Sequence, residues 1–145
     1  MLYSLKILTI FNFMLPLHVT NESARLRAVV LGIANSNGPT PLAEEAYDPK
    51  SLEHILAGTY PKEADMVREM DAFAAVFEKY DVRVYRPELV ENENQIFSRD
   101  IAFVIDDVFV KANILPERTK ELPAIQYLID QIDPAKILTP PEDAH

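Results

Sequence analysis

The apolar positions of this chain follow two periods, one typical of strands and one typical of helices. Residues 26–33 (LRAVVLGI) form an apolar, β-branched run that predicts a largely buried strand. Residues 82–87 (VRVYRP) alternate with period two and predict a second strand. Between them, residues 61–79 repeat apolar side chains every three or four positions, which predicts an amphipathic helix. We expect its apolar stripe to pack in the core: Met66, Met70, Phe73, Phe77 and Tyr80.

The second half of the chain predicts a hairpin, a helix and a strand. The apolar runs 101–105 and 108–114 are separated by two aspartates, which suits a tight turn between two strands. A helix is expected to begin at Pro123, followed by a short strand at 135–139 (AKILT). The helix should turn four residues inward: Ile125, Leu128, Ile129 and Ile132. The predicted order indicates α/β architecture: strand, helix, strand, hairpin, helix, strand.

One long segment carries no such period. Residues 35–50 (NSNGPTPLAEEAYDPK) contain an Asn-Gly pair, three prolines and several acidic residues, so they are predicted to form a loop. A loop of this length in a compact domain is more often functional or mobile than a simple connection.

Composition then narrows the classes of function. The 145 residues include 14 basic and 23 acidic ones, giving a net charge of −9, so nucleic-acid binding is not expected. The chain has no cysteine, which excludes disulfides, thiolate metal sites and a cysteine nucleophile within it. Its three glycines are not grouped into a phosphate-binding loop. We therefore expect neither a metal nor a cofactor.

Residues 1–20 are predicted to be an N-terminal extension. Their apolar stretch, 5–17 (LKILTIFNFMLPL), is only 13 residues long and too short to span a bilayer. A signal peptide is the alternative, but no small-x-small cleavage site follows, so we favour an irregular extension or an extra strand. We expect no membrane association and a cytoplasmic location.

Asp100 raises the question of a site, because it directly precedes the apolar run 101–105. A carboxylate at the edge of a core needs a partner, and within a strand Arg99 would point to the opposite face. One interpretation is structural, with ordinary ion pairs at Arg99 and Asp100 and a turn in which Arg118 pairs with Glu121. The other is a ligand site. Since the start of the first hairpin strand meets the end of the second, Asp100 and Arg118 are expected to face a common polar channel.

The wider pattern favours the ligand site. Residues 94–121 read N-x-x-F-x-R-D, an apolar hairpin, and R-x-x-E before a helix. This pattern resembles the guanidino-group-modifying enzymes, which include amidinotransferases, arginine deiminases and dimethylarginine hydrolases. Residues 21–32 and 47–87 extend the resemblance, which is closest to bacterial glycine-amidinotransferase-like proteins and covers about residues 21–145.

The resemblance implies a pentein fold, an α/β propeller of which residues 21–145 would form the N-terminal portion, with about two of five blades. It implies that Asp100 accepts hydrogen bonds from a substrate guanidinium and that Arg118 binds the substrate carboxylate. Phe97 would form an apolar wall of the same site. The residues implied as structural support are Asn94, Arg99 and Glu121.

The family's chemistry uses a cysteine nucleophile and a proton-transferring histidine, and no motif of this chain supplies either. We therefore expect the N-terminal fragment of an amidinotransferase-type enzyme that acts on arginine or a related guanidino compound. Alone, it should be inactive and should self-associate through exposed blade edges. Two alternatives stay open: a fragment of a deiminase or dimethylarginine hydrolase, and a non-catalytic α/β module that binds a cationic metabolite or a partner protein.

Overall fold

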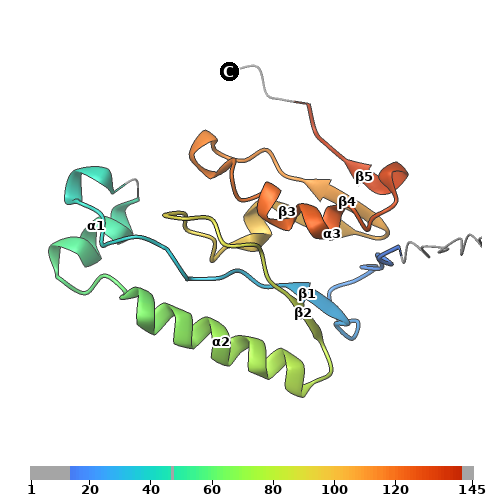
Figure 1. The fold of residues 1–145 in the computed structure, drawn as a ribbon, viewed down its shortest axis with the longest axis horizontal. Coiled ribbons are helices and arrows are strands. Elements are labelled where there is room, and N and C mark those ends of the chain that lie inside the picture. The colour runs from blue at the N-terminus through green and yellow to red at the C-terminus, as the bar shows by residue number, and fades with distance from the viewer. Residues whose placement is uncertain (1–13, 47, 142–145) are drawn as a thin grey trace, which may run out of the picture.

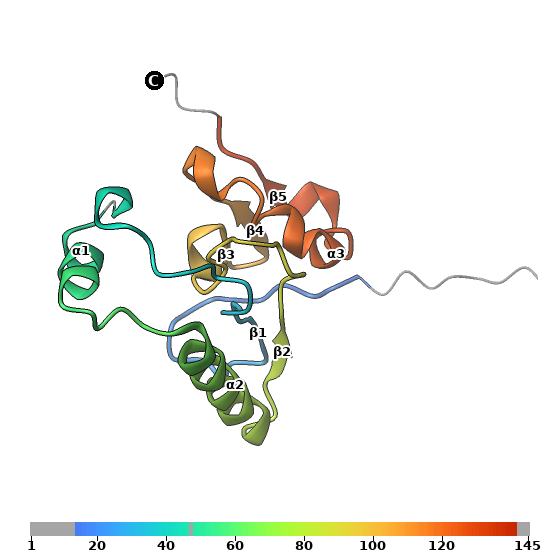
Figure 2. The ribbon, with the colours of Figure 1, turned by 60° about the vertical axis from the view of Figure 1, so that its left-hand side comes forward.

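The computed structural model describes residues 14–46 and 48–141 and contains the predicted elements in the predicted order, with one further helix. Along the chain lie β1 (Ala28–Val30), α1 (Pro49–Leu56), α2 (Glu63–Lys79), β2 (Arg83–Tyr85), β3 (Ala102–Ile105), β4 (Val108–Lys111), α3 (Gln126–Ile129) and β5 (Ile137–Leu138). The strands form two sheets, ordered β1-β2 and β3-β4-β5. Figures 1 and 2 show the β1–β2 pair between α2 on one side and the three-stranded sheet with α3 on the other. The predicted α/β class is confirmed.

The first unit is β1, α2 and a parallel β2, with Val29 opposite Val84. α2 forms where its sequence favours a helix at both ends. Two acidic residues, Glu63 and Asp65, lie in its first turn and Lys79 lies in its last, so each charge complements the helix dipole. The helix spans the range that the apolar spacing predicts.

The burial of α2 differs from the prediction. None of its residues is buried, and in its apolar stripe Phe73 is 48% and Tyr80 is 64% exposed. Met66 and Met70 are half-buried and line a shallow cavity of about 300 Å³ beside Ile96. The spacing of the stripe is helical, as expected, but among the described residues the β1–β2 pair covers it only in part, with Phe77 half-buried like the two methionines. The stripe is therefore a half-buried face and not a core.

The second unit is a hairpin with a parallel third strand. β3 and β4 pair in antiparallel with Ile105 opposite Val108, so Asp106 and Asp107 make the two-residue turn that the sequence predicts. Asp106 has a φ of 51°, in the left-handed region that such turns require. β5 then pairs in parallel with β4 after α3 has crossed one face of the sheet.

The main core lies between α3 and this sheet. It consists of Ile101, Phe109, Ile125, Leu128, Ile129 and Ile132, each no more than 7% exposed. The four inward positions predicted for the second helix are therefore confirmed. The helix itself is shorter than a regular one, because the 3-10 turn Pro123–Ile125 precedes α3. Val30 and Tyr85 pack against the same core, which joins the two units.

The N-terminal prediction falls mostly on residues outside those described. Within residues 14–20, Val19 exchanges two backbone hydrogen bonds with Asp106, of 2.7 and 2.8 Å, and this isolated bridge flanks the outer edge of β3. In the described part of the chain, no helix is long and apolar enough to cross a membrane.

α1 lies partly in the segment predicted to be a loop. Asp48 caps it by accepting a hydrogen bond from the Ser51 amide at 2.8 Å, and Pro49 occupies its first position. The Asp-Pro pair is a helix-start signal that could have predicted this helix. α1 stands apart from both sheets in Figures 1 and 2 and buries no residue.

Candidate functional site

Asp100 and Arg118 come together at one end of the hairpin. Asp100 ends the 3-10 helix Ser98–Asp100, just before β3, and Arg118 ends the 3-10 helix Pro116–Arg118, after β4. Because β3 and β4 are antiparallel, the start of one lies beside the end of the other. The distance between Arg118 Nη1 and Asp100 Oδ2 is 2.9 Å. The spatial proximity inferred from the hairpin is present in the structure.

The open channel expected between these two side chains is absent, since they form a direct ion pair. Arg118 also donates from Nε to Glu121 Oε1 at 2.5 Å and from Nη2 to Glu121 Oε2 at 2.9 Å. Nη2 donates further to the Phe97 carbonyl at 3.3 Å. A guanidinium has five N–H groups, so these four bonds leave Arg118 one N–H on Nη1.

Solvent exposure increases across the cluster, from Glu121 through Arg118 to Asp100. The exposed fractions of the three side chains are 3% for Glu121, 25% for Arg118 and 42% for Asp100. The hydrogen bond to Glu121, with a smaller one to Asp100, raises the pKa of Arg118 although burial opposes this, so Arg118 stays charged at any working pH. Two carboxylates and one guanidinium carry a net charge of −1. Asp100 has the most exposed carboxylate of the cluster, and Arg99 lies 3.5 Å from its Oδ1 as a second cation.

The side chain of Arg99 was predicted to point away from Asp100 on a strand, and this is wrong because Asp100 does not begin a strand. The amides of Asp100 and Ile101 bond back to Phe97 and Ser98 at 3.0 and 3.3 Å, which makes a 3-10 turn before β3 starts at Ala102. Neighbouring side chains in such a turn are not forced onto opposite faces. Arg99 Nε consequently lies 3.5 Å from Asp100 Oδ1, with the Arg99 side chain 86% exposed.

The other two residues of the motif occupy different settings. Phe97 is 49% exposed and contributes its carbonyl to Arg118. Asn94 accepts a hydrogen bond from the Ile96 amide at 3.2 Å, which stabilises the turn at the start of the motif.

Two further residues near the cluster had no signal in the sequence. Glu93, whose side chain is 14% exposed, pairs with Lys120 at 2.6 Å, so a second ion pair ties the segment before the motif to the segment after β4. Gln95 is 2% exposed and bridges the Val90 amide and the Glu88 carbonyl at 2.8 and 2.9 Å. The contact between Glu93 and Lys120 joins residues 27 positions apart in the chain, which leaves no local pattern to detect.

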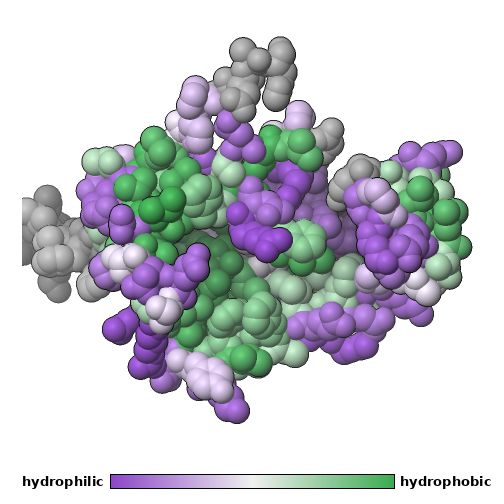
Figure 3. Space-filling model, turned by 180° about the vertical axis from the view of Figure 1, so that it is seen from behind, coloured by the Kyte–Doolittle hydropathy of each residue, from purple (hydrophilic) through white to green (hydrophobic). Residues whose placement is uncertain are grey.

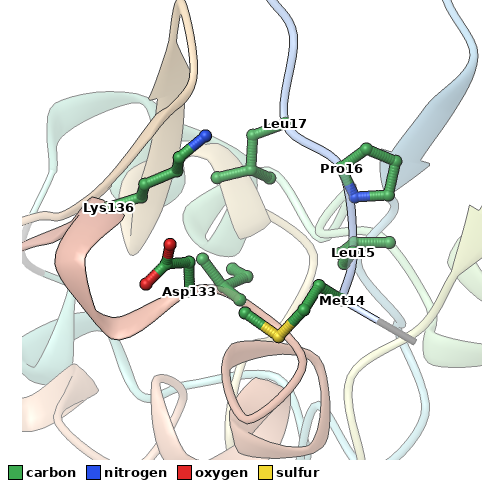
Figure 4. A pocket seen from close by; sticks show the side chains of 7 residues that line it. Met14, Leu15, Pro16, Leu17, Asp133 and Lys136 are labelled. Carbon is green, nitrogen blue, oxygen red and sulfur yellow. The ribbon is translucent and has the colours of Figure 1, made fainter. Parts of the chain in front are cut away.

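A cavity of about 280 Å³ lies elsewhere, between residues 14–17 and the turn after α3 (Figure 4). Its charged side chains are Asp133 and Lys136. Asp133 accepts a hydrogen bond from the Ala135 amide at 3.0 Å, and Lys136 pairs with Asp107 at 2.9 Å. Each of these two charged side chains therefore already has a partner within the described part of the chain. Among the described residues, no group of three or more histidine or acidic side chains is placed to hold a metal ion.

Comparison with solved structures gives the class of protein to which this fold is similar. The chain has the α/β fold of amidinotransferases, of which two show the likeness. One is SxtG, an amidinotransferase from Microseira wollei in the saxitoxin biosynthetic pathway, with a TM-score of 0.62 and 19% identity over 90% of this chain and 43% of that one. The other is the inosamine-phosphate amidinotransferase StrB1 from Streptomyces griseus, with a TM-score of 0.58 and 18% identity over 88% of this chain and 44% of that one.

The present chain thus spans less than half the length of each amidinotransferase that it matches. Its sequence matches no family model and no curated protein. The amidinotransferase-like fold predicted from the motif is confirmed. The number of propeller blades and the roles of the site residues stay predictions.

Proposed function

We propose that this chain is the N-terminal portion of an amidinotransferase-type enzyme that acts on the guanidino group of arginine or a related compound. The observation that carries the proposal is the fold shared with two amidinotransferases over about nine tenths of the chain. The motif around Asp100 adds a carboxylate of suitable chemistry at a fixed position in that fold.

Asp100 is the proposed acceptor for the substrate guanidinium. Its support is chemical, since a carboxylate matches two guanidinium N–H groups, and Arg118 already makes one such contact with it. The other oxygen, Oδ1, has only the exposed Arg99 near it at 3.5 Å. A substrate guanidinium would approach Oδ1 from solvent, with Phe97 as the apolar wall beside it.

Arg118 is proposed to orient Asp100 and to offer its remaining N–H on Nη1 to the substrate carboxylate. Glu121 holds the other side of its guanidinium, so Arg118 would act from a fixed position. Asn94, Arg99 and Glu121 are then supporting residues.

The proposed reaction needs a thiolate and a proton carrier that these 145 residues do not supply. In the proposed chemistry the thiolate attacks the guanidino carbon, the amine leaves with a proton from a histidine, and the amidino group passes to an acceptor amine. The chain alone should therefore form no product from arginine.

The test is reconstitution with the polypeptide encoded directly after codon 145. The proposal requires that polypeptide to carry a cysteine and a histidine, and the mixture should transfer the amidino group from arginine to an amine. Asp100→Asn keeps the size but removes the charge, and it should lower kcat/KM by about 30-fold or more. Asp107→Asn, in the exposed hairpin turn, is the matched control and should leave the rate unchanged. Turnover by the 145-residue chain alone, an inactive mixture, or full activity of Asp100→Asn would contradict the proposal.

A further inference from the structure

Ser36 ties the loop after β1 to the turn formed by Glu91 and Asn92. Its Oγ accepts a hydrogen bond from the Asn92 amide at 3.0 Å and donates to Glu91 Oε2 at 3.4 Å. Ser36 and Asn92 have φ angles of 58° and 59°, so each turn contains a residue in the left-handed region. The two turns thus meet through one hydroxyl group, and the next residues of the loop, Asn37 and Gly38, are half-buried.

Asn37 is the asparagine of this sequence that a glycine follows. Its Oδ1 is shielded from solvent and accepts no hydrogen bond within the described part of the chain, although a buried carbonyl oxygen normally has a donor. The Asn37 side-chain nitrogen and the Gly38 amide also have no hydrogen-bond partner among residues 14–46 and 48–141. No hydrogen bond described in the structure therefore holds the Asn37 side chain away from the backbone nitrogen that follows it.

The surroundings of Gly38 leave that nitrogen accessible. Gly38 has a φ of 87°, in the left-handed region that glycine adopts without steric cost. No residue beyond its chain neighbours has an atom within 4 Å of the place where a Cβ would lie. The loop leads on to α1, and the view from behind in Figure 3 shows the region of α1 as mainly hydrophilic beside the apolar middle of that face. Water can therefore reach this part of the molecule.

We propose that Asn37 is a site of spontaneous deamidation, which makes this loop a slow, one-way switch. Hydroxide removes the proton of the Gly38 amide, and the nitrogen attacks Cγ of Asn37. The bond from Cγ to the side-chain nitrogen breaks, and ammonia leaves with a proton from water. Water then opens the resulting succinimide at either carbonyl and gives aspartate or isoaspartate. In total one water molecule is consumed and one ammonia molecule is released, so the reaction needs no other reactant.

The product weakens the attachment of the loop to the 91–92 turn. Isoaspartate directs the main chain through the side-chain methylene, which adds one atom to the backbone directly after Ser36. Both products place a new carboxylate next to Ser36, whose Oγ lies 3.4 Å from the Glu91 carboxylate. Like charges repel, and the net charge of the chain is already −9. The hydrogen bond between Ser36 and the Asn92 amide should therefore be lost after conversion.

Mass spectrometry of the 145-residue chain, kept at neutral pH and 37 °C for several days, tests the site. The peptide that contains Asn37 should gain the mass that separates a carboxyl from a carboxamide group, and isoaspartyl methyltransferase should methylate it. Asn35 is the internal control, because it is exposed in the same loop but is followed by serine, whose Cβ hinders the attack. Asn35 should convert about tenfold more slowly than Asn37. The matched variant Asn37→Gln should stay unmodified, since its attack would need a larger ring.

Two further measurements separate the effect of the fold from that of the local sequence. A free peptide of residues 33–41 gives the rate without the fold, and the folded chain should convert within about tenfold of it. Hydrogen exchange reports the release of the loop. In the wild type, the protection factor of the Asn92 amide should fall as the converted fraction grows, and in Asn37→Gln it should not change with time.

Four results would each overturn the proposal. They are conversion of the folded chain more than about tenfold slower than the peptide, an Asn35 that converts as fast as Asn37, a rate that does not rise with pH, and an unchanged Asn92 protection factor after conversion. The proposed deamidation does not depend on the amidinotransferase assignment, so its failure would leave the proposed function unaffected.

Discussion

Removal of the Arg118 side chain tests whether the Asp100–Arg118–Glu121 cluster supports the fold. Glu121 is 3% exposed, and the bonds from Arg118 at 2.5 and 2.9 Å are its side-chain partners in the described structure. Arg118→Met keeps an apolar stem of similar length but leaves a buried carboxylate without its cation. Breaking a buried pair in this way costs about 3–5 kcal/mol, and the 25% exposure of Arg118 favours the lower end because water can reach the vacated space.

Two further variants give free energies of unfolding with which that of Arg118→Met can be compared. Glu121→Gln keeps one acceptor for Arg118 Nε, and Arg118 keeps Asp100 and the Phe97 carbonyl, so the free energy of unfolding should fall by only about 1–2 kcal/mol. The double variant Arg118→Met, Glu121→Leu removes both charges and should be more stable than Arg118→Met alone by about 1–3 kcal/mol, since no buried charge is left unpaired.

Urea unfolding followed by circular dichroism at 222 nm, at one protein concentration, gives these free energies. The expected order of stability is wild type, Glu121→Gln, Arg118→Met, with the double variant above Arg118→Met. An Arg118→Met protein within about 0.5 kcal/mol of wild type, the usual range for surface substitutions, would refute the reasoning. So would a double variant less stable than Arg118→Met.

Two further predictions concern a glycine in close contact and the N-terminal cap of α1. A Cβ at Gly32 would lie 2.1 Å from the Ile96 carbonyl oxygen, so Gly32→Ala should lower the free energy of unfolding by more than about 3 kcal/mol. Gly58 has a φ of 66° and open space around it, so Gly58→Ala should lower it by about 1 kcal/mol. Equal losses in urea unfolding would contradict this expectation. The bond from Ser51 lowers the pKa of Asp48 below its ordinary 3.8, so the capping contribution is present above that value and is lost as the pH falls through the lowered pKa. Asp48→Ala should therefore lower the protection factor of the Ser51 amide at pH 6 and remove the pH dependence of that protection factor near pH 3. An unchanged protection factor would refute the cap.

Local sequence determined the succession of elements. Helical spacing with acidic residues at the start defined α2, and two aspartates between apolar runs defined the hairpin turn. The inward face of the segment after Pro123 was equally clear. Such features depend on backbone periodicity and on residues a few positions apart, which a sequence displays directly. The motif around Asp100 also carried the resemblance that implied the amidinotransferase-like fold.

Tertiary structure alone decided which side chains meet and which faces are covered. The 3-10 turn before β3 brought Arg99 to Asp100, although a strand would have separated them. Arg118 met Asp100 directly, without a channel between them, because Glu121 holds its guanidinium in place from the other side. The α2 stripe has the spacing of a core helix, and yet none of its residues is fully buried. Periodicity states which face of a helix is apolar, but burial depends on a second surface, and that surface comes from residues far away in the sequence or on another chain.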